Sequence, residues 1–205
     1  MTKPGRKIRS STRKTARAIG GATAKKNGKV TEELVENLNT IYSELGISFR
    51  LRKNYEPYIR CGFVRGGFKA VYKGEAEPDF SIWLNNLAGY IEVKGRDNHR
   101  IRKDCVDVHQ MTQLLESQLQ GHLGLILCKI QDKLSGLSKW FLCDAFQWNG
   151  SDGISFTGDE IIKKKIGVEC NLVPGTESPH ILESLNKLYP SLNYNYLPKV
   201  VKNDD

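Results

Sequence analysis

The sequence of 205 residues predicts an α/β fold in which a central mixed β-sheet is flanked by helices. Three observations support this fold class. Apolar residues recur with a helical period near the N-terminal third. Two strand-like runs separated by turn residues predict a β-hairpin in the middle of the chain. A second helical pattern then precedes two apolar runs of strand length, which gives the order helix, strand, hairpin, helix, strand, strand.

The first predicted helix covers residues 30–45, where the pattern stops at Gly46. Its apolar residues are Leu34, Leu38, Ile41 and Leu45. Residues 47–51 then alternate as a strand does, with Arg50 and Arg52 on the polar face. This strand is expected to begin the sheet.

The predicted hairpin carries two acids and a lysine. Asp79 precedes the apolar run 80–84, and residues 85–89 have the composition of a turn. In the following strand Glu92 and Lys94 project from one face, while the alternate residues Ile91 and Val93 face a core. Folding of the hairpin would therefore bring Asp79 beside Glu92.

Two carboxylates that meet in this way repel each other unless a cation lies between them. Hard oxygen ligands favour Mg²⁺ over softer metals, and Mn²⁺ is expected to substitute for it. Such an ion contacts a phosphate oxygen and lowers the pKa of an attacking water, while Lys94 stabilises the developing charge. The motif thus predicts a magnesium-dependent nuclease with Asp79 and Glu92 as metal ligands. An exposed cross-strand ion pair of no catalytic importance is the alternative interpretation.

Residues 53–77 interleave aromatic and basic side chains around Gly62, Gly66 and Gly67. Such a composition suits stacking on bases and binding of phosphates. The candidate DNA contacts in this segment are Arg60, Arg65, Lys69 and Lys73. An ordinary hairpin whose aromatic residues pack in the core is the alternative.

Beyond the hairpin, Arg96, Arg100 and Arg102 belong to a predicted basic loop that could also contact DNA. A helix over 104–120 is expected to bury Met111, Leu114, Leu115 and Leu119. Buried strands are predicted at residues 123–130 and 139–143, and short helices near 158–165 and 179–188.

Pro78-Asp79, a spacer and Glu92-Val93-Lys94 on an apolar strand resemble the signature of the PD-(D/E)xK nuclease superfamily. The flanking segments over residues 28–148, with the run Ala70–Gly74 before the acidic motif, resemble Holliday-junction resolvases of the RecU type. The approach to the motif, residues 74–77, and the long tail after Trp148 depart from RecU patterns. These departures put the choice of substrate in doubt more than the chemistry.

The resemblance implies a restriction-endonuclease-like core with a stalk, at residues 53–77, that enters a DNA junction. It implies that Glu32 is a helix-borne catalytic acid, with Glu33 and Glu36 as close alternatives. An acid in the first turn of a helix is also favoured by the helix dipole, so a purely structural role for Glu32 stays open. The resemblance further implies that Gln110 orients water or DNA and that the carbonyl of Val93 is an additional metal ligand. The product would carry a 5′-phosphate.

The net charge of +8 is distributed unevenly, because residues 1–29 contain ten of the 31 basic residues and none of the 23 acids. The candidate phosphate contacts in this arm are Arg6, Lys7, Arg9, Arg13, Lys14 and Arg17. Such an arm suits salt-dependent DNA binding, and a solubilising or targeting tail is the alternative. Five widely spaced cysteines without a Cys-x-x-Cys pair argue against a disulfide framework and a structural zinc site. No run resembles a membrane span or a secretory signal, so we expect a cytoplasmic protein of a bacterium or of a phage-infected cell.

We expect three parts: a basic arm at 1–28, a nuclease core at 29–170 and a C-terminal extension at 171–205. The function predicted from the sequence is resolution of four-way DNA junctions by a magnesium-dependent endonuclease. Paired cuts need two active sites, so a homodimer is expected. The alternatives are a restriction or repair endonuclease acting on linear or damaged duplex, and a non-catalytic DNA-binding protein.

Overall fold

The computed structural model describes residues 28–54, 58–64, 67–72, 77–84, 87–96 and 98–192. Its centre is a six-stranded sheet with the order β1-β4-β5-β7-β8-β10. The strands are β1 (Phe49–Lys53), β4 (Phe80–Leu84), β5 (Leu87–Arg96), β7 (Leu123–Gln131), β8 (Ser138–Asp144) and β10 (Gly167–Cys170). Only β5 and β7 pair in parallel, and the other neighbours are antiparallel. The predicted mixed sheet is therefore confirmed.

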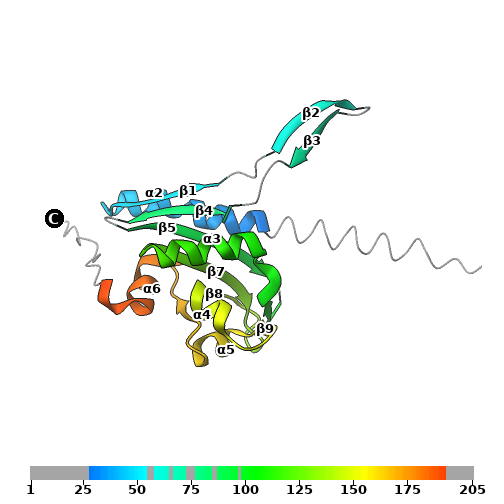
Figure 1. Cartoon of the computed structure of the whole chain (residues 1–205). Helices are drawn as coiled ribbons and strands as arrows, with labels where there is room; N and C mark the ends of the chain where they lie inside the picture. The colour runs from blue at the N-terminus through cyan, green and yellow to red at the C-terminus, as the bar shows by residue number, and fades with distance from the viewer. Residues whose placement is uncertain are drawn as a thin grey trace, which may run out of the picture.

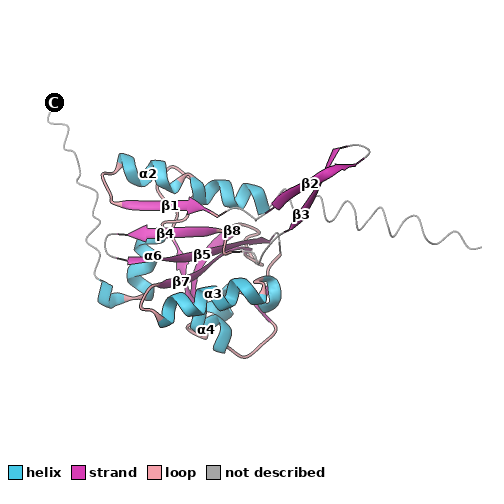
Figure 2. Cartoon of the chain, turned by 45° about the horizontal axis from the view of Figure 1, so that its top comes forward, coloured by secondary structure: helices cyan, strands magenta, loops and turns pink. Residues whose placement is uncertain are grey.

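Helices cover both faces of this sheet (Figures 1 and 2). On one face, a helical segment at residues 28–36, α2 (Leu38–Glu44) and α6 (Ile181–Leu188) contribute to one apolar cluster with β1, β4, β5, β7 and β8. On the other face, α3 (Val108–Leu119), α4 (Ala145–Gly150) and α5 (Gly158–Lys163) enclose a second cluster. The result is the predicted α/β arrangement of a sheet between two layers of helices.

The first helix and strand differ from the prediction mainly at their ends. Helix 28–36 continues into α2 through a turn at Asn37, and the hydrogen bonds from Asn37 N to Glu33 O and from Ile41 N to Asn37 O bridge the turn. Strand β1 begins two residues later than expected, because the chain first turns at Gly46, whose φ is +68°. Arg50 and Arg52 lie on its exposed face as predicted, with Leu51 buried between them.

The predicted β-hairpin is formed by β4 and β5. Its turn is shorter than the expected 85–89, because Leu87 already pairs with Leu84 and residues 87–89 belong to β5. A two-residue connection of this kind sets the register of the whole hairpin. Phe80 consequently pairs with Ile91. The next residues along the two strands, Asp79 and Glu92, therefore lie opposite each other.

Two expectations about the following segment were wrong. Leu119 of α3 is 75% exposed, because the buried side of this helix is made by Gln110, Leu114 and Ser117. The predicted basic loop is largely ordered as secondary structure: β6 (Ile101–Arg102) pairs with β9 (Ser155–Phe156), and a 3₁₀ turn follows at Lys103–Cys105.

Strands β2 (Tyr58–Val64) and β3 (Gly67–Tyr72) form a separate antiparallel sheet. Figure 1 shows this hairpin extending away from the six-stranded sheet. Its side chains lie outside what the structure describes, so the stalk and the alternative of a hairpin whose aromatic residues pack in the core both stay predictions.

The C-terminal segment contributes to the core. Ile181, Leu182 and Leu185 of α6 are fully buried in the first apolar cluster, although residues 171–205 were expected to be an extension. A 3₁₀ turn at Pro190–Leu192 ends the described part of the chain. Within the described residues, no helix is long and apolar enough to cross a membrane.

Candidate active site

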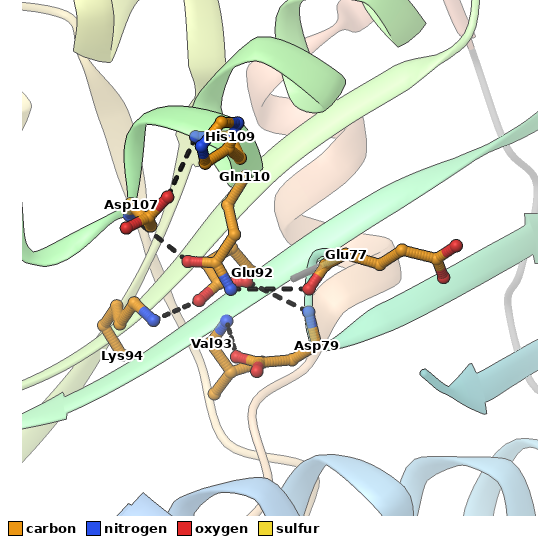
Figure 3. Close-up of polar contacts among 8 residues, drawn as sticks. All are labelled: Glu77, Asp79, Glu92, Val93, Lys94, Asp107, His109 and Gln110. Carbon is orange, nitrogen blue, oxygen red and sulfur yellow. Dashed lines mark hydrogen bonds and ion pairs between the residues drawn. The ribbon is translucent and has the colours of Figure 1, made fainter. Parts of the chain in front are cut away.

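The β4–β5 hairpin brings the two acids of the motif into contact through backbone groups (Figure 3). The Asp79 N–H donates to Glu92 Oε2 over 3.0 Å, and the Val93 N–H donates to Asp79 Oδ2 over 2.8 Å. Each carboxylate therefore accepts a hydrogen bond from the strand that carries the other. This reciprocal arrangement fixes both acids at the start of β4.

Glu92 and Lys94 lie on the same side of β5, and the Lys94 ammonium is paired with Glu92 Oε1. Ile91 and Val93 point to the opposite side, where they join the first apolar cluster. Glu92 is fully buried, and the side chain of Lys94 is 21% exposed. The alternative interpretation of this motif was an exposed cross-strand ion pair. It does not fit, because the Glu92 carboxylate has no contact with solvent.

Pro78 has a specific consequence for the backbone of Val93. Hydrogen-bonded pairs in an antiparallel ladder recur every second residue, so Pro78 and Val93 would form the next pair after Phe80 and Ile91. Proline has no N–H to donate to the Val93 carbonyl, and the Val93 N–H is already bonded to Asp79. Pro78 therefore cannot continue the hydrogen-bonded ladder at this pair.

Burial raises the proton affinity of both acids. Burial raises the pKa of Glu92 to about 8, the charge of Asp79 contributes to the increase, and Lys94 opposes it. Burial likewise raises the pKa of Asp79, while Lys94 and the Val93 N–H act in the opposite direction. Burial lowers the pKa of Lys94, but the charges of Glu92 and Asp79 outweigh this effect and keep its pKa above the usual value. The site thus contains two buried acids that favour uptake of a proton, beside one ammonium that keeps its charge.

Helix 28–36 brings Glu32 to the same end of the sheet. Its carboxylate is close enough to Asp79 to raise the pKa of that acid. Lys53 at the end of β1 binds Glu32 Oε2 at 2.9 Å and Glu36 Oε1 at 2.6 Å. Glu33 instead faces solvent and pairs with Lys29. Of the three candidate acids, only Glu32 acts on Asp79.

A glycine permits this close approach of helix and strand. A Cβ added at Gly95 would lie 2.2 Å from the hydroxyl oxygen of Thr31, which is buried. The residue before Glu32 therefore packs directly on the backbone that follows Lys94. The fold therefore requires a glycine at position 95, which the motif alone did not reveal.

Gln110 lies over the site from α3, and its side chain has two structural contacts (Figure 3). Its Oε1 accepts from the Asp107 N–H at 3.2 Å and completes a capping box at the start of α3. Its Nε2 donates over a long 3.4 Å to the carbonyl of Glu77. Gln110 is buried beside the acids but is engaged with the backbone around them.

Asn54, which sequence reasoning missed, holds the same backbone from the other side. Its side chain bonds to the Pro78 carbonyl and to the Ser81 hydroxyl. No local pattern marks this residue, because its partners are at least 24 positions away in the sequence.

The predicted DNA contacts fall into three groups. Arg100 pairs with Glu160 at 2.9 Å, and Arg102 pairs with Asp104, so both are engaged in ion pairs at the surface. The side chains of Arg60, Lys69 and Arg96 lie outside what the structure describes. The same holds for all of Arg65 and Lys73, and for the arm residues Arg6, Lys7, Arg9, Arg13, Lys14 and Arg17.

The donor set fits a hard divalent cation. Within the described part of the chain, no three or more His, Cys, Asp or Glu side chains form a group that could hold a metal. Mg²⁺ does not require such a cage, since it is usually bound by one or two carboxylates and keeps several waters. Asp79 and Glu92 retain lone pairs beyond their present hydrogen bonds, and a cation would stabilise the charged form of both acids, which burial disfavours.

Comparison with known proteins found similarity among solved structures. No protein-family model matches the chain, and no curated protein matches its sequence. Among solved structures, Hjc of Archaeoglobus fulgidus, a Holliday junction resolvase from an archaeal hyperthermophile, is similar with a TM-score of 0.38 and 13% identity. The similarity covers 69% of the present chain and 95% of the archaeal chain.

Proposed function

We propose that this protein is a magnesium-dependent endonuclease that cuts branched DNA, with four-way junctions as its substrate. The observation that carries the proposal is the contact of Asp79 with Glu92 and Val93, beside the ammonium of Lys94. Two acids in mutual contact, with elevated pKa and a lysine at hydrogen-bond distance, are costly for stability and are typical of a catalytic site.

Asp79, Glu92 and the Val93 carbonyl would hold the ion. Bound there, Mg²⁺ supplies charge stabilisation at a phosphate oxygen and lowers the pKa of an attacking water. Lys94 keeps its proton, because Glu92 and Asp79 raise its pKa, and can donate a hydrogen bond to the phosphate as negative charge develops. Glu32 adds a third acid near Asp79, and Gln110 keeps the backbone around Glu77 in place.

One feature favours a branched substrate over a linear duplex, and a second favours binding to DNA of either form. The β2–β3 hairpin projects from the sheet immediately before the acidic motif, where the RecU-like resemblance puts a stalk (Figure 1). The basic arm provides phosphate contacts that do not depend on sequence. Paired cuts across a junction need two sites, so the active form would be a homodimer.

The test is cleavage of a labelled four-way junction beside its linear duplex arms, with Mg²⁺ and with EDTA. The parent protein and Asp79→Asn are compared. We expect paired, symmetric nicks on the junction that require both Mg²⁺ and Asp79. Equal cutting of the duplex would indicate a restriction or repair nuclease, and tight binding without cutting would indicate a DNA-binding protein.

A further inference from the structure

The position of Asp79 depends on contacts outside its own strand. Asp79 lies just before β4, where the chain returns to the six-stranded sheet after the β2–β3 hairpin. The chain leaves the sheet for that hairpin directly after β1, at Asn54. The two ends of the inserted hairpin therefore meet beside the acid.

Asn54 joins these two ends by three hydrogen bonds. Its backbone N–H donates to the Asp79 carbonyl over 2.8 Å. Its Nδ2 donates to the Pro78 carbonyl over 2.8 Å, and its Oδ1 accepts from the Ser81 hydroxyl over 2.9 Å. One residue thus holds the backbone at Pro78 and at Asp79 and the side chain of Ser81.

The chemistry of the carboxamide explains why the residue is asparagine. A carboxamide carries a donor and an acceptor on one short planar group, so it can donate to a carbonyl and accept from a hydroxyl at the same time. The contact from the opposite side, from Gln110 to Glu77, is longer at 3.4 Å. Asn54 is therefore the stronger of the two side-chain restraints on this segment.

We propose that Asn54 is a positioning residue, which closes the base of the β2–β3 hairpin and thereby holds the Asp79 carboxylate against the Val93 N–H. Loss of the two side-chain bonds loosens residues 78 and 79, which precede the paired residues of β4, so that Asp79 no longer meets Val93 and Glu92 in a fixed geometry. The consequence for metal affinity rests on the proposed function, whereas the consequence for the Asp79–Val93 hydrogen bond does not.

The chain offers a matched control in Asn39. Its carboxamide also bridges two backbone groups, since Oδ1 accepts from Leu51 N at 2.6 Å and Nδ2 donates to Leu51 O at 2.8 Å. Asn39 therefore holds α2 to β1 with the same chemistry, but it makes no contact with residues 77–81. Asn39→Ala and Asn54→Ala each remove one carboxamide that makes two hydrogen bonds at β1 or next to it.

The experiment measures two quantities on the DNA-free protein, with Ser81→Ala as a milder variant that removes one bond of the restraint. Amide hydrogen exchange at Val93, followed by NMR without metal, reports the bond to Asp79. Mn²⁺ affinity, followed by electron paramagnetic resonance, reports the site. We expect Asn54→Ala to exchange Val93 at least about tenfold faster than Asn39→Ala, with Ser81→Ala in between. Mn²⁺ affinity should fall about 10- to 100-fold in Asn54→Ala, as is usual when an outer contact of a metal ligand is removed.

Equal exchange at Val93 in the two alanine variants would overturn the proposal, because Asn54 would then have only a general role in stability. Faster exchange with parental Mn²⁺ affinity would overturn the positioning role as well. If the parent itself bound no Mn²⁺, the proposed function would fail, and the exchange comparison alone would decide the role of Asn54.

Discussion

At the scale of single residues, Glu92 is the most unusual group in the protein. A fully buried glutamate gains little from the ammonium of Lys94 compared with what it loses by leaving water. The nearby Asp79 adds repulsion and raises the pKa of Glu92 further. A stable fold alone would not require this arrangement, which is consistent with the cation site proposed above.

A pH dependence of stability follows from the elevated pKa. In the metal-free protein the pKa of Glu92 is about 8, against 4.5 for an ordinary glutamate, so the folded state binds more protons between these values. The free energy of unfolding should therefore fall as the pH rises from about 5 to 8. The expected loss is a few kcal/mol, since one pKa unit corresponds to about 1.4 kcal/mol. Chemical denaturation of the parent and of Glu92→Gln, in EDTA across this range, measures it as the difference between the two proteins.

Taking the difference between the two proteins removes the contributions of other groups. One of these groups is His180, because burial lowers its pKa. Glu183→Gln is the control. The hydrogen bond from Lys187 lowers the pKa of Glu183, so its contribution changes below the ordinary glutamate pKa and not between pH 5 and 8. Parallel pH profiles for the parent and Glu92→Gln would contradict an elevated pKa at Glu92.

At the scale of elements, the site depends on how closely helix 28–36 packs on β5. Gly95→Ala places a methyl group 2.2 Å from the Thr31 hydroxyl oxygen, so the helix must move outward. We expect a loss of about 1–3 kcal/mol in unfolding free energy, as for other overpacked positions. The double variant Gly95→Ala/Thr31→Ala should recover part of it. Gly28→Ala, with open space around its added carbon, should change stability by less than about 0.5 kcal/mol in the same denaturation experiment.

Gly95→Ala costing no more than Gly28→Ala would show that the helix is not held against the strand. The position of Glu32 relative to Asp79 would then have no basis in this contact.

The elements that the sequence predicted well are those with local signals. The β4–β5 hairpin and its acids follow from strand alternation and turn residues, and β7 follows from a continuous apolar run. Strand β10 was not predicted, because only four residues, Gly167–Cys170, pair with a distant strand. The predicted burial of Leu119 was wrong, because helical periodicity does not show that polar residues, here Gln110 and Ser117, lie on the buried side.

The residues of the site divide in the same way into those with a local sequence signal and those without one. Asp79, Glu92 and Lys94 could be named from their spacing, since a strand alternates its side chains. Asn54 and Thr31 could not, because each acts through a partner that is distant in the sequence. Contacts of this kind become visible only when the fold is known.

At the scale of the whole molecule, the C-terminal segment completes the core. Leu182 of α6 is fully buried in the cluster that also contains Val93. Leu182→Ala should therefore lower the free energy of unfolding by about 2–5 kcal/mol. Leu172→Ala, in the same segment but 48% exposed, should cost clearly less. Thermal and chemical denaturation measure both. Similar small effects would mean that α6 adds little to the core, as expected of a C-terminal extension.

The central claim is that Asp79 and Glu92 form a site for a divalent cation. A Mn²⁺ titration of the DNA-free protein, followed by electron paramagnetic resonance, tests it most directly. The parent and Asp132→Asn, which alters an acid in the turn between β7 and β8, should bind Mn²⁺ alike. Asp79→Asn and Glu92→Gln should each lose that binding. Equal Mn²⁺ binding by all four proteins, or none by the parent, would contradict the claim.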